Sequence, residues 1–383
     1  MDLFQRIITL SLKLLKMIDK AKTIIFSGSG KPLEKKEFDL PEEINDNEIL
    51  VELTLSTVCG SDVHTWLGHR SFPTPCILGH EMVGKIVKLG KNLTKDNDGN
   101  KVTIGDRIVW SMTVGCGTCY YCKTAKLPQK CISLLKYGHV DIHTSPYLTG
   151  GYANFIQLKK GSYFLKIPDL LDDEEVAPLM CAGATITSGL DSAKFSSCDY
   201  VLIQGCGALG LCACAFAKEL GAKCVIALDK VDSRLSLAKE FGADYVFNIN
   251  KEKNLLKKIL ELTLDRGVDY VIEVTGDSKS IEKGIKYLRI GGSYILLGAI
   301  YPGNTFTLDS SEIITKCLQI IGRHNYDPIY LKQALDLVTI SKNQYPFKKL
   351  VGPSFDFSPE GLEKAFKSLE SKNAIRPCIY PSL

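Results

Sequence analysis

Apolar runs separated by amphipathic stretches dominate residues 195–322. Six short runs rich in Val, Ile, Leu and Tyr alternate with segments of helical periodicity such as Ser233–Phe241 and Ser278–Leu288. The predicted strands are Val201–Ile203, Cys224–Leu228, Tyr245–Phe247, Val268–Val274, Tyr294–Leu297 and Leu318–Ile321. Nearly continuous apolar strands that alternate with helices indicate a parallel, doubly wound α/β sheet buried on both faces.

The pattern changes on both sides of this segment. Residues 21–185 carry short β-branched runs, such as Ile49–Val51 and Ile108–Trp110, between Gly, Pro and Asp turns, which predicts an irregular β-rich domain. Residues 325–383 are mixed, with helices expected near 331–337 and 360–369. Residues 1–20 place apolar side chains at roughly helical spacing beside basic ones, which fits a targeting helix, a packed extra helix or an upstream extension.

Composition excludes several classes of protein. The chain has 383 residues, of which 45% are hydrophobic and 23% are charged, as in ordinary globular proteins of one or two domains. A net charge of +4 is too small to indicate nucleic acid, and no apolar run reaches the roughly 20 residues of a membrane span. In a chain this long without a clear signal peptide, 14 cysteines favour metal ligation and buried thiols over disulfides.

A glycine-rich loop follows the first strand of the predicted parallel sheet. Gly205-Cys206-Gly207-Ala208-Leu209-Gly210 lies between a strand and a helix, which is the context of a dinucleotide-binding loop. Gly205 permits the turn, Gly207 the approach of a pyrophosphate, and Gly210 close packing of helix on sheet. The helix N-terminus would face the phosphates.

An acidic residue is expected about 20 residues later, where it would accept hydrogen bonds from the ribose of NAD and repel the 2′-phosphate of NADP. Asp229 stands there, at the end of the second strand. The neighbouring positive charges of Lys230 and Arg234 would weaken that discrimination. We assign these residues and Thr275, after the fourth strand, to the cofactor site.

Six cysteines and one histidine have the spacing or setting of zinc ligands. Cys116, Cys119, Cys122 and Cys131 form a C-x2-C-x2-C-x8-C run, which can enclose Zn²⁺ in four thiolates and is therefore structural. Cys59, His80 and Cys181 would instead give three protein ligands and an open position, as catalytic zinc requires. The remaining eight cysteines lie in apolar runs and are expected in the core.

Together these motifs resemble the zinc-containing medium-chain alcohol dehydrogenases over nearly all of residues 22–383. The motifs are Cys-Gly-Ser-Asp with His64, Gly-His-Glu at 79–81, the four-cysteine lobe, the Met-Cys-Ala-Gly segment around Cys181, and the glycine loop with Asp229. The resemblance implies a GroES-like catalytic domain (1–188, with a structural-zinc lobe at 112–135), an NAD-binding Rossmann domain (189–323) and a C-terminal return to the catalytic domain (324–383). It also implies one catalytic and one structural zinc per chain, a small alcohol or aldehyde substrate, a homodimer or homotetramer, and a cytoplasmic protein.

The resemblance also carries residue roles. Ser61 would take the alcohol proton and relay it through the cofactor ribose to His64, which would pass it to water, because a histidine pKa near neutrality suits that exchange. Asp62 would accept the N–H of His80, and Glu81 would approach the metal. Polyol dehydrogenases place a glutamate near the third ligand, where this chain has Ala177. Glu174 or Glu175 as the third ligand is therefore the alternative to Cys181.

Several stretches further resemble alcohol dehydrogenases associated with phosphonate catabolism, among them His64-Thr65-Trp66, Lys136-Tyr137-Gly138-His139 and His324-Asn325-Tyr326. A hydroxyalkylphosphonate substrate is thus one expectation, and a polyol- or threonine-type dehydrogenase or a non-catalytic NAD-binding scaffold are the others. Candidate residues of the substrate cleft are Trp66, His69, Arg70, Lys136, His139 and Arg323. Arg70 or Lys136 would hold a phosphonate or carboxylate, since a guanidinium binds such oxyanions with two parallel hydrogen bonds. The alternative is that these residues are surface charges or contact the NAD pyrophosphate.

Overall fold

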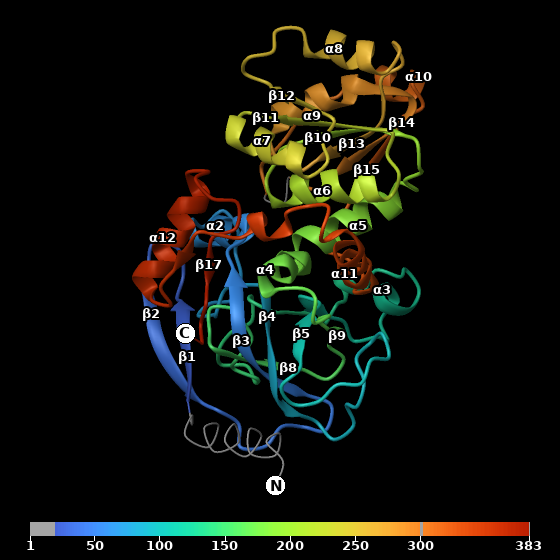
Figure 1. Cartoon of the computed structure of the whole chain (residues 1–383). Coiled ribbons are helices and arrows are strands. Elements are labelled where there is room, and N and C mark those ends of the chain that lie inside the picture. Colours follow the sequence, from blue (N-terminus) through green and yellow to red (C-terminus); the bar gives the residue numbers. More distant parts are fainter. Residues whose placement is uncertain (1–19, 299–301, 383) are drawn as a thin grey trace.

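The computed structural model describes residues 20–298 and 302–382, which form two bodies joined by helices (Figure 1). The upper body is built on a six-stranded sheet and the lower on a seven-stranded sheet. The predictions for residues 1–19 lie outside the described residues. Within the described residues, no helix has the length and apolar character needed to cross a membrane.

The upper sheet confirms the predicted parallel, doubly wound arrangement. Its strand order is β12-β11-β10-β13-β14-β15, and every neighbouring pair is parallel. The strands are β10 (Tyr200–Gln204), β11 (Cys224–Asp229), β12 (Tyr245–Asn248), β13 (Val268–Glu273), β14 (Leu288–Leu296) and β15 (Gln319–Gly322). The order reverses between β10 and β13. Ligands of such sheets bind at the carboxyl ends of the strands beside that reversal.

Helices cover the upper sheet. They are α6 (Ala208–Glu219), α7 (Asp232–Glu240), α8 (Leu255–Leu262), α9 (Ser278–Gly284) with the 3-10 turn η3 (Ile285–Tyr287), and α10 (Ser310–Thr315). Helix α6 is buried on nearly all sides because it packs against the sheet and against a helix of the lower body. The expected helix over 278–288 is shorter than predicted, since the chain tightens after Gly284 and enters β14 at Leu288.

The lower sheet is irregular and mostly antiparallel, with the order β16-β17-β3-β4-β5-β9 and β8 paired with β3. Its strands are β3 (Ile49–Thr57), β4 (Glu81–Leu89), β5 (Arg107–Trp110), β8 (Phe155–Leu158), β9 (Phe164–Lys166), β16 (Ser354–Phe355) and β17 (Cys378–Ile379). Two small two-stranded antiparallel sheets accompany it, β1 (Lys20–Phe26) with β2 (Leu33–Asp39), and β6 (Thr113–Val114) with β7 (Leu135–Lys136). Because β17 pairs with β3, the end of the chain returns to the lower body.

The lower body and its junction contain short helices. These are α2 (Gly60–Trp66), α3 (Tyr120–Lys123), α4 (Asp173–Val176), α5 (Ala182–Ser192), α11 (Ile329–Ser341) and α12 (Pro359–Glu370), with 3-10 turns η1 (Pro128–Lys130), η2 (Ala177–Met180) and η4 (Phe347–Leu350). Helix α5 packs against both α6 and α11, so one apolar core runs from the lower sheet into the upper one. The prediction that all eight remaining cysteines are core residues is wrong for Cys198 and Cys317, which are exposed at turns.

Candidate active site

A compact cluster of metal-ligating side chains lies where the lower sheet meets α5. Ligand atoms of Cys59, His80, Glu81 and Cys181 all lie within 4.8 Å of one another. Cys59 precedes α2, His80 immediately precedes β4, Glu81 is the first residue of β4, and Cys181 lies between η2 and α5. The two sulfur atoms are 3.9 Å apart. Zinc–sulfur bonds of about 2.3 Å at a tetrahedral angle would separate them by roughly 3.8 Å, so the donor set fits Zn²⁺.

Asp62 holds this cluster in place. One of its carboxylate oxygens accepts a hydrogen bond from Nδ1 of His80 at 3.0 Å, and the other accepts from the Cys59 backbone N–H at 3.0 Å and from the Tyr152 hydroxyl at 3.1 Å. Because Nδ1 donates to Asp62, Nε2 of His80 is turned toward the sulfur atoms as a ligand. Burial would lower the pKa of His80, yet Asp62 and Cys59 raise it to about 10, because their negative charges attract a cation to this position, which suits a metal ion as well as a proton.

Glu81 is tied to an arginine that sequence reasoning missed. Its carboxylate accepts hydrogen bonds from Nε of Arg376 at 2.8 Å and from the Thr57 hydroxyl at 2.6 Å. Burial raises the pKa of Glu81 to about 7, and Arg376 opposes that rise. Arg376 lies 295 positions away in sequence, and its only sequence signal is a lone charge among apolar residues just before β17.

The alternative third ligands do not join the cluster. Glu174 accepts a hydrogen bond from the Tyr380 hydroxyl at 2.8 Å, and Glu175 accepts one from the Asp172 backbone N–H at 2.9 Å. Both carboxylates therefore form hydrogen bonds around α4, and Cys181 is the residue that lies beside Cys59 in the cluster.

The two residues assigned to proton transfer lie on α2 beside the cluster. Ser61 is buried, with its hydroxyl 3.3 Å from Nε2 of His80. His64 is half-buried one turn further along, where its Nδ1 lies 3.1 Å from Nδ1 of His69. Burial, then the charges of His69 and Arg70, lower the pKa of His64. Both Ser61 and His64 line the cavity that Cys59, His80 and Cys181 also line.

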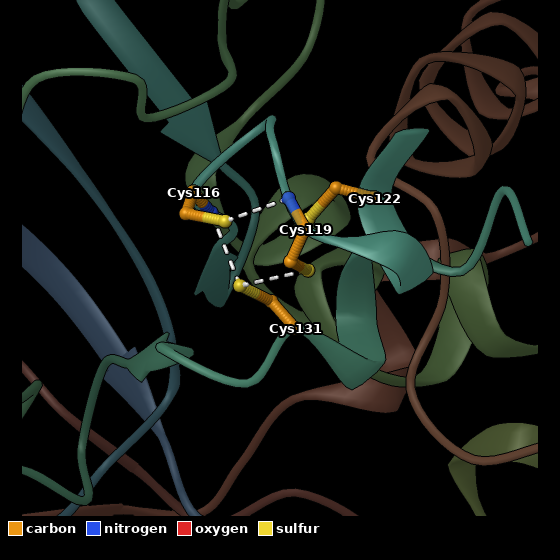
Figure 2. Close-up of side chains that lie close together, drawn as sticks. All are labelled: Cys116, Cys119, Cys122 and Cys131. Atoms are coloured by element: carbon orange, nitrogen blue, oxygen red, sulfur yellow. Dashed lines mark hydrogen bonds between the residues drawn. The ribbon is translucent and has the colours of Figure 1, made fainter. Parts of the chain in front are cut away.

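A second cluster forms the expected four-cysteine lobe. Figure 2 shows the side chains of Cys116, Cys119, Cys122 and Cys131 projecting toward a common centre, and their sulfur atoms lie within 4.8 Å of one another. Backbone N–H groups of Cys116 and Ser133 donate to the sulfur of Cys131 at 3.2 and 3.3 Å. Hydrogen bonds from Thr118 and the backbone lower the pKa of Cys116 to about 5.

The glycine loop connects β10 to α6 at the sheet's reversal point. Gly205 adopts a φ of 100°, and a Cβ on Gly210 would stand 1.8 Å from the oxygen of Gly205. Asp229 accepts hydrogen bonds from the backbone N–H groups of Cys206 and Lys230, both at 2.7 Å. The acidic residue thus lies directly beside the loop, as its position at the end of β11 predicts.

The other assigned cofactor residues surround the loop. Lys230 pairs with Asp277 at 3.4 Å, and Arg234 donates to the Ala374 carbonyl at 3.1 Å. A cavity of about 450 Å³ contains Gly205, Gly207, Asp229, Lys230, Arg234 and Thr275 in its walls.

A larger cavity of about 530 Å³ joins the two sites. Its walls include Cys59, His80 and Cys181 from the lower body and Gly207, Ala208, Leu209, Gly210 and Thr275 from the upper body. Of the candidate cleft residues, His69, Arg70, Lys136 and Arg323 also line it. Trp66 instead packs on Phe366, and His139 is buried against Phe72. His324, which was not assigned to the cleft, is a further wall residue.

Comparisons with known proteins agree with this geometry. Residues 45–169 match the family described as "Alcohol dehydrogenase GroES-like domain", and residues 208–339 match "Zinc-binding dehydrogenase". An L-threonine 3-dehydrogenase of Pyrococcus horikoshii is 30% identical, covering 94% of this chain and 97% of its own length. A D-arabitol-phosphate dehydrogenase of Enterococcus avium is 30% identical, covering 84% and 89%.

A solved structure extends the likeness to three dimensions. The crystal structure of an alcohol dehydrogenase from Thermotoga maritima superposes with a TM-score of 0.89 at 32% identity, covering 94% of this chain and 99% of that one. A ligand cluster suited to zinc and a glycine-rich dinucleotide loop line one cavity. Residues 45–169 and 208–339 both match families of zinc-type alcohol dehydrogenases. The chain therefore belongs to the zinc-dependent alcohol dehydrogenase family.

Proposed function

We propose that this chain transfers hydride between the carbinol carbon of a small alcohol and NAD. The observation that carries the proposal is the shared cavity, in which Cys59, His80 and Cys181 face the loop Gly207–Gly210. Hydride transfer requires the reacting carbon and the nicotinamide to meet, and the cavity brings a metal site and a nucleotide site into one space.

Cys59, His80 and Cys181 would hold the zinc ion, with Glu81 beside them. When bound, zinc supplies Lewis acidity that lowers the proton affinity of an alcohol oxygen, and NAD supplies the hydride acceptor. The protein orients the ligands through Asp62 and buries them, so that water is largely kept from the reacting atoms.

The alcohol proton needs a path out of this buried space. The Ser61 hydroxyl is buried beside His80 and can accept that proton at Oγ. His64 lies on the same helix, closer to solvent, and its imidazole can pass the proton to water. We assign the relay to these two residues.

Asp229 supports NAD over NADP. Its carboxylate lies beside the loop backbone, where a ribose 2′-phosphate would meet its negative charge. Arg234 and Lys230 lie in the same walls and offset part of that repulsion, so we expect a preference rather than strict exclusion.

Candidate substrates include hydroxyalkylphosphonates, polyols and threonine-like alcohols. Two matched relatives are named for a polyol phosphate and for threonine, which supports alcohols that carry further polar groups.

We further propose a homo-oligomer that uses the open edge of the upper sheet. β15 pairs only with β14 along the described sheet, and the exposed side chains of Ile290, Ile314 and Ile320 lie in or near this edge. An unpaired edge with apolar side chains favours pairing with a second copy.

Zinc content and turnover test the proposal together. We expect one zinc for each of the two clusters, and NAD reduction with at least one alcohol that a chelator abolishes and added zinc restores. Cys59→Ser should lose activity and about one zinc, whereas Cys317→Ser, at an exposed cysteine outside both clusters, should lose neither. A zinc-loaded, NAD-binding protein that oxidises no alcohol in a broad panel would instead support a non-catalytic scaffold.

A further inference from the structure

Two cationic side chains share one aromatic platform at the wall of the large cavity. The guanidinium carbon of Arg70 lies 4.8 Å from the centre of the Phe72 ring, and Nζ of Lys136 lies 5.6 Å from the same centre. The face of an aromatic ring attracts cations, so Phe72 fixes both charges in neighbouring positions. The Phe72 ring in turn packs on His139, which is 5% exposed, with the two ring centres 4.0 Å apart and the planes at 61°.

Neither cation has an ionic partner within the part of the chain that the structure describes. Nη1 of Arg70 is buried without a hydrogen-bond partner. The buried Arg376, by contrast, is paired with Glu81, and the partly buried Arg107 with Asp173 at 2.9 Å. Arg70 and Lys136 are partly buried, and a partly buried cation without a partner costs folding free energy, so such groups concentrate at functional sites.

The surrounding groups do not neutralise this pair. Asp62 already accepts three hydrogen bonds, and Cys59 and Cys181 belong to the metal cluster. Among the described residues that line this cavity, Glu370 is the one that carries a carboxylate. It is exposed at the end of α12.

The positive charge of this pair lowers the pKa values of cationic groups nearby. Burial, followed by the charge of Arg70, lowers the pKa of Lys136 to about 8. Burial and the charges of Lys130, Lys136 and Arg70 lower the pKa of His324, another wall residue, to about 4. A bound anion would relieve this repulsion between like charges.

We propose that Arg70 and Lys136 form an oxyanion-binding subsite beside the metal cluster, and that the substrate is an alcohol bearing a carboxylate, phosphate or phosphonate group. The inference rests on the proposed alcohol oxidation and specifies its substrate class. A guanidinium offers two parallel donors to such a group and an ammonium adds a point charge, so together they orient the anion and leave the hydroxyl free to reach the metal.

The competing occupant is the pyrophosphate of the cofactor. Arg70 follows α2 and Lys136 lies in β7, both in the lower body, whereas the glycine loop that suits a pyrophosphate belongs to the upper body. His139, behind the shared Phe72, has its ring centre 5.7 Å from that of His80, which places the platform on the metal side of the cavity. The substrate is therefore the better match.

Steady-state kinetics with matched alcohols tests the subsite. The panel has one carbon skeleton and one hydroxyl, and it ends in a methyl, carboxylate, phosphate or phosphonate group. We expect kcat/KM to be about 10- to 100-fold higher for at least one anionic member than for the methyl member, as charge-assisted hydrogen bonds imply. Arg70→Gln and Lys136→Met should each remove most of that preference, because kcat/KM should fall much further for the anionic member than for the methyl member. Lys160→Met, at an exposed lysine of the same body, is the charge control and should retain it.

A binding measurement separates the two proposals. Calorimetric titration with inorganic phosphate, in the presence of NAD, should detect binding to wild type and a loss of affinity of about tenfold or more in Arg70→Gln. Phosphate binding without oxidation of any alcohol would support the subsite and overturn the proposed reaction. Equal kcat/KM across the panel would overturn the subsite alone. If Arg70→Gln or Lys136→Met instead raised KM for NAD with every substrate, the two cations would be assigned to the pyrophosphate, and the subsite proposal would also be overturned.

Discussion

Two alanine substitutions in the glycine loop should affect different properties: one should lower the stability of the fold, and the other should weaken NAD binding. A Cβ added to Gly207 would meet nothing within 4 Å, and the backbone there, with φ −77°, accepts any residue. A Cβ added to Gly210 would stand 1.8 Å from the Gly205 oxygen, where ordinary contacts begin at 3.4 Å. The Gly210 variant must therefore move α6 away from the loop by more than an ångström.

That overlap sets the expected magnitudes. Overpacking against backbone costs typically 1–3 kcal/mol and sometimes more, so Gly210→Ala should lose about 2–3 kcal/mol of unfolding free energy. In a chain of this size each kcal/mol lowers Tm by about 2 °C, which predicts a fall of about 4–6 °C without cofactor. Gly207→Ala should change stability by less than about 0.5 kcal/mol. Its methyl group would occupy the space that a pyrophosphate needs, so its Kd for NAD should rise about tenfold or more.

Thermal denaturation without cofactor and calorimetric titration with NAD measure the two effects separately. A Gly210→Ala protein with the wild-type Tm would refute the packing argument, because the helix would then have room for the methyl group. A Gly207→Ala protein with wild-type NAD affinity would show that the pyrophosphate does not approach the loop at this residue.

Three further changes test other parts of the site. Cys119→Ser should lose about one zinc per chain and lower Tm while NAD affinity persists, because four thiolates would leave a bound zinc no open position for substrate; elemental analysis and thermal denaturation measure this. Asp62→Asn should weaken zinc binding about 10- to 100-fold in competition with a chelator, whereas Tyr152→Phe, which removes one donor but keeps the carboxylate, should change it little. His64→Gln should slow hydride transfer at neutral pH and regain rate in imidazole buffers; an unchanged single-turnover rate would remove His64 from the proton path.

Much of the fold follows from local patterns in the sequence. The six strands of the upper sheet and the loop before α6 were predictable because burial on both faces demands continuous apolar runs, and because a tight turn beside a helix demands glycine at fixed offsets. The four-cysteine lobe was predictable for a related reason, since its ligands come from 16 consecutive residues, 116–131, and their spacing records the geometry directly.

Contacts between residues that are far apart in the sequence could be known only from the fold. Arg376 reaches Glu81 only because β17 returns to pair with β3, and no local pattern of residues encodes that pairing. Trp66 and His139 have chemistry suited to the cleft, yet Trp66 packs on Phe366 and His139 is buried against Phe72, while His324 reaches the cavity wall. Local sequence preferences thus determined the elements and the metal-binding residue types. Long-range packing determined which charges were left without partners beside the metal cluster, because pairing depends on neighbours in space.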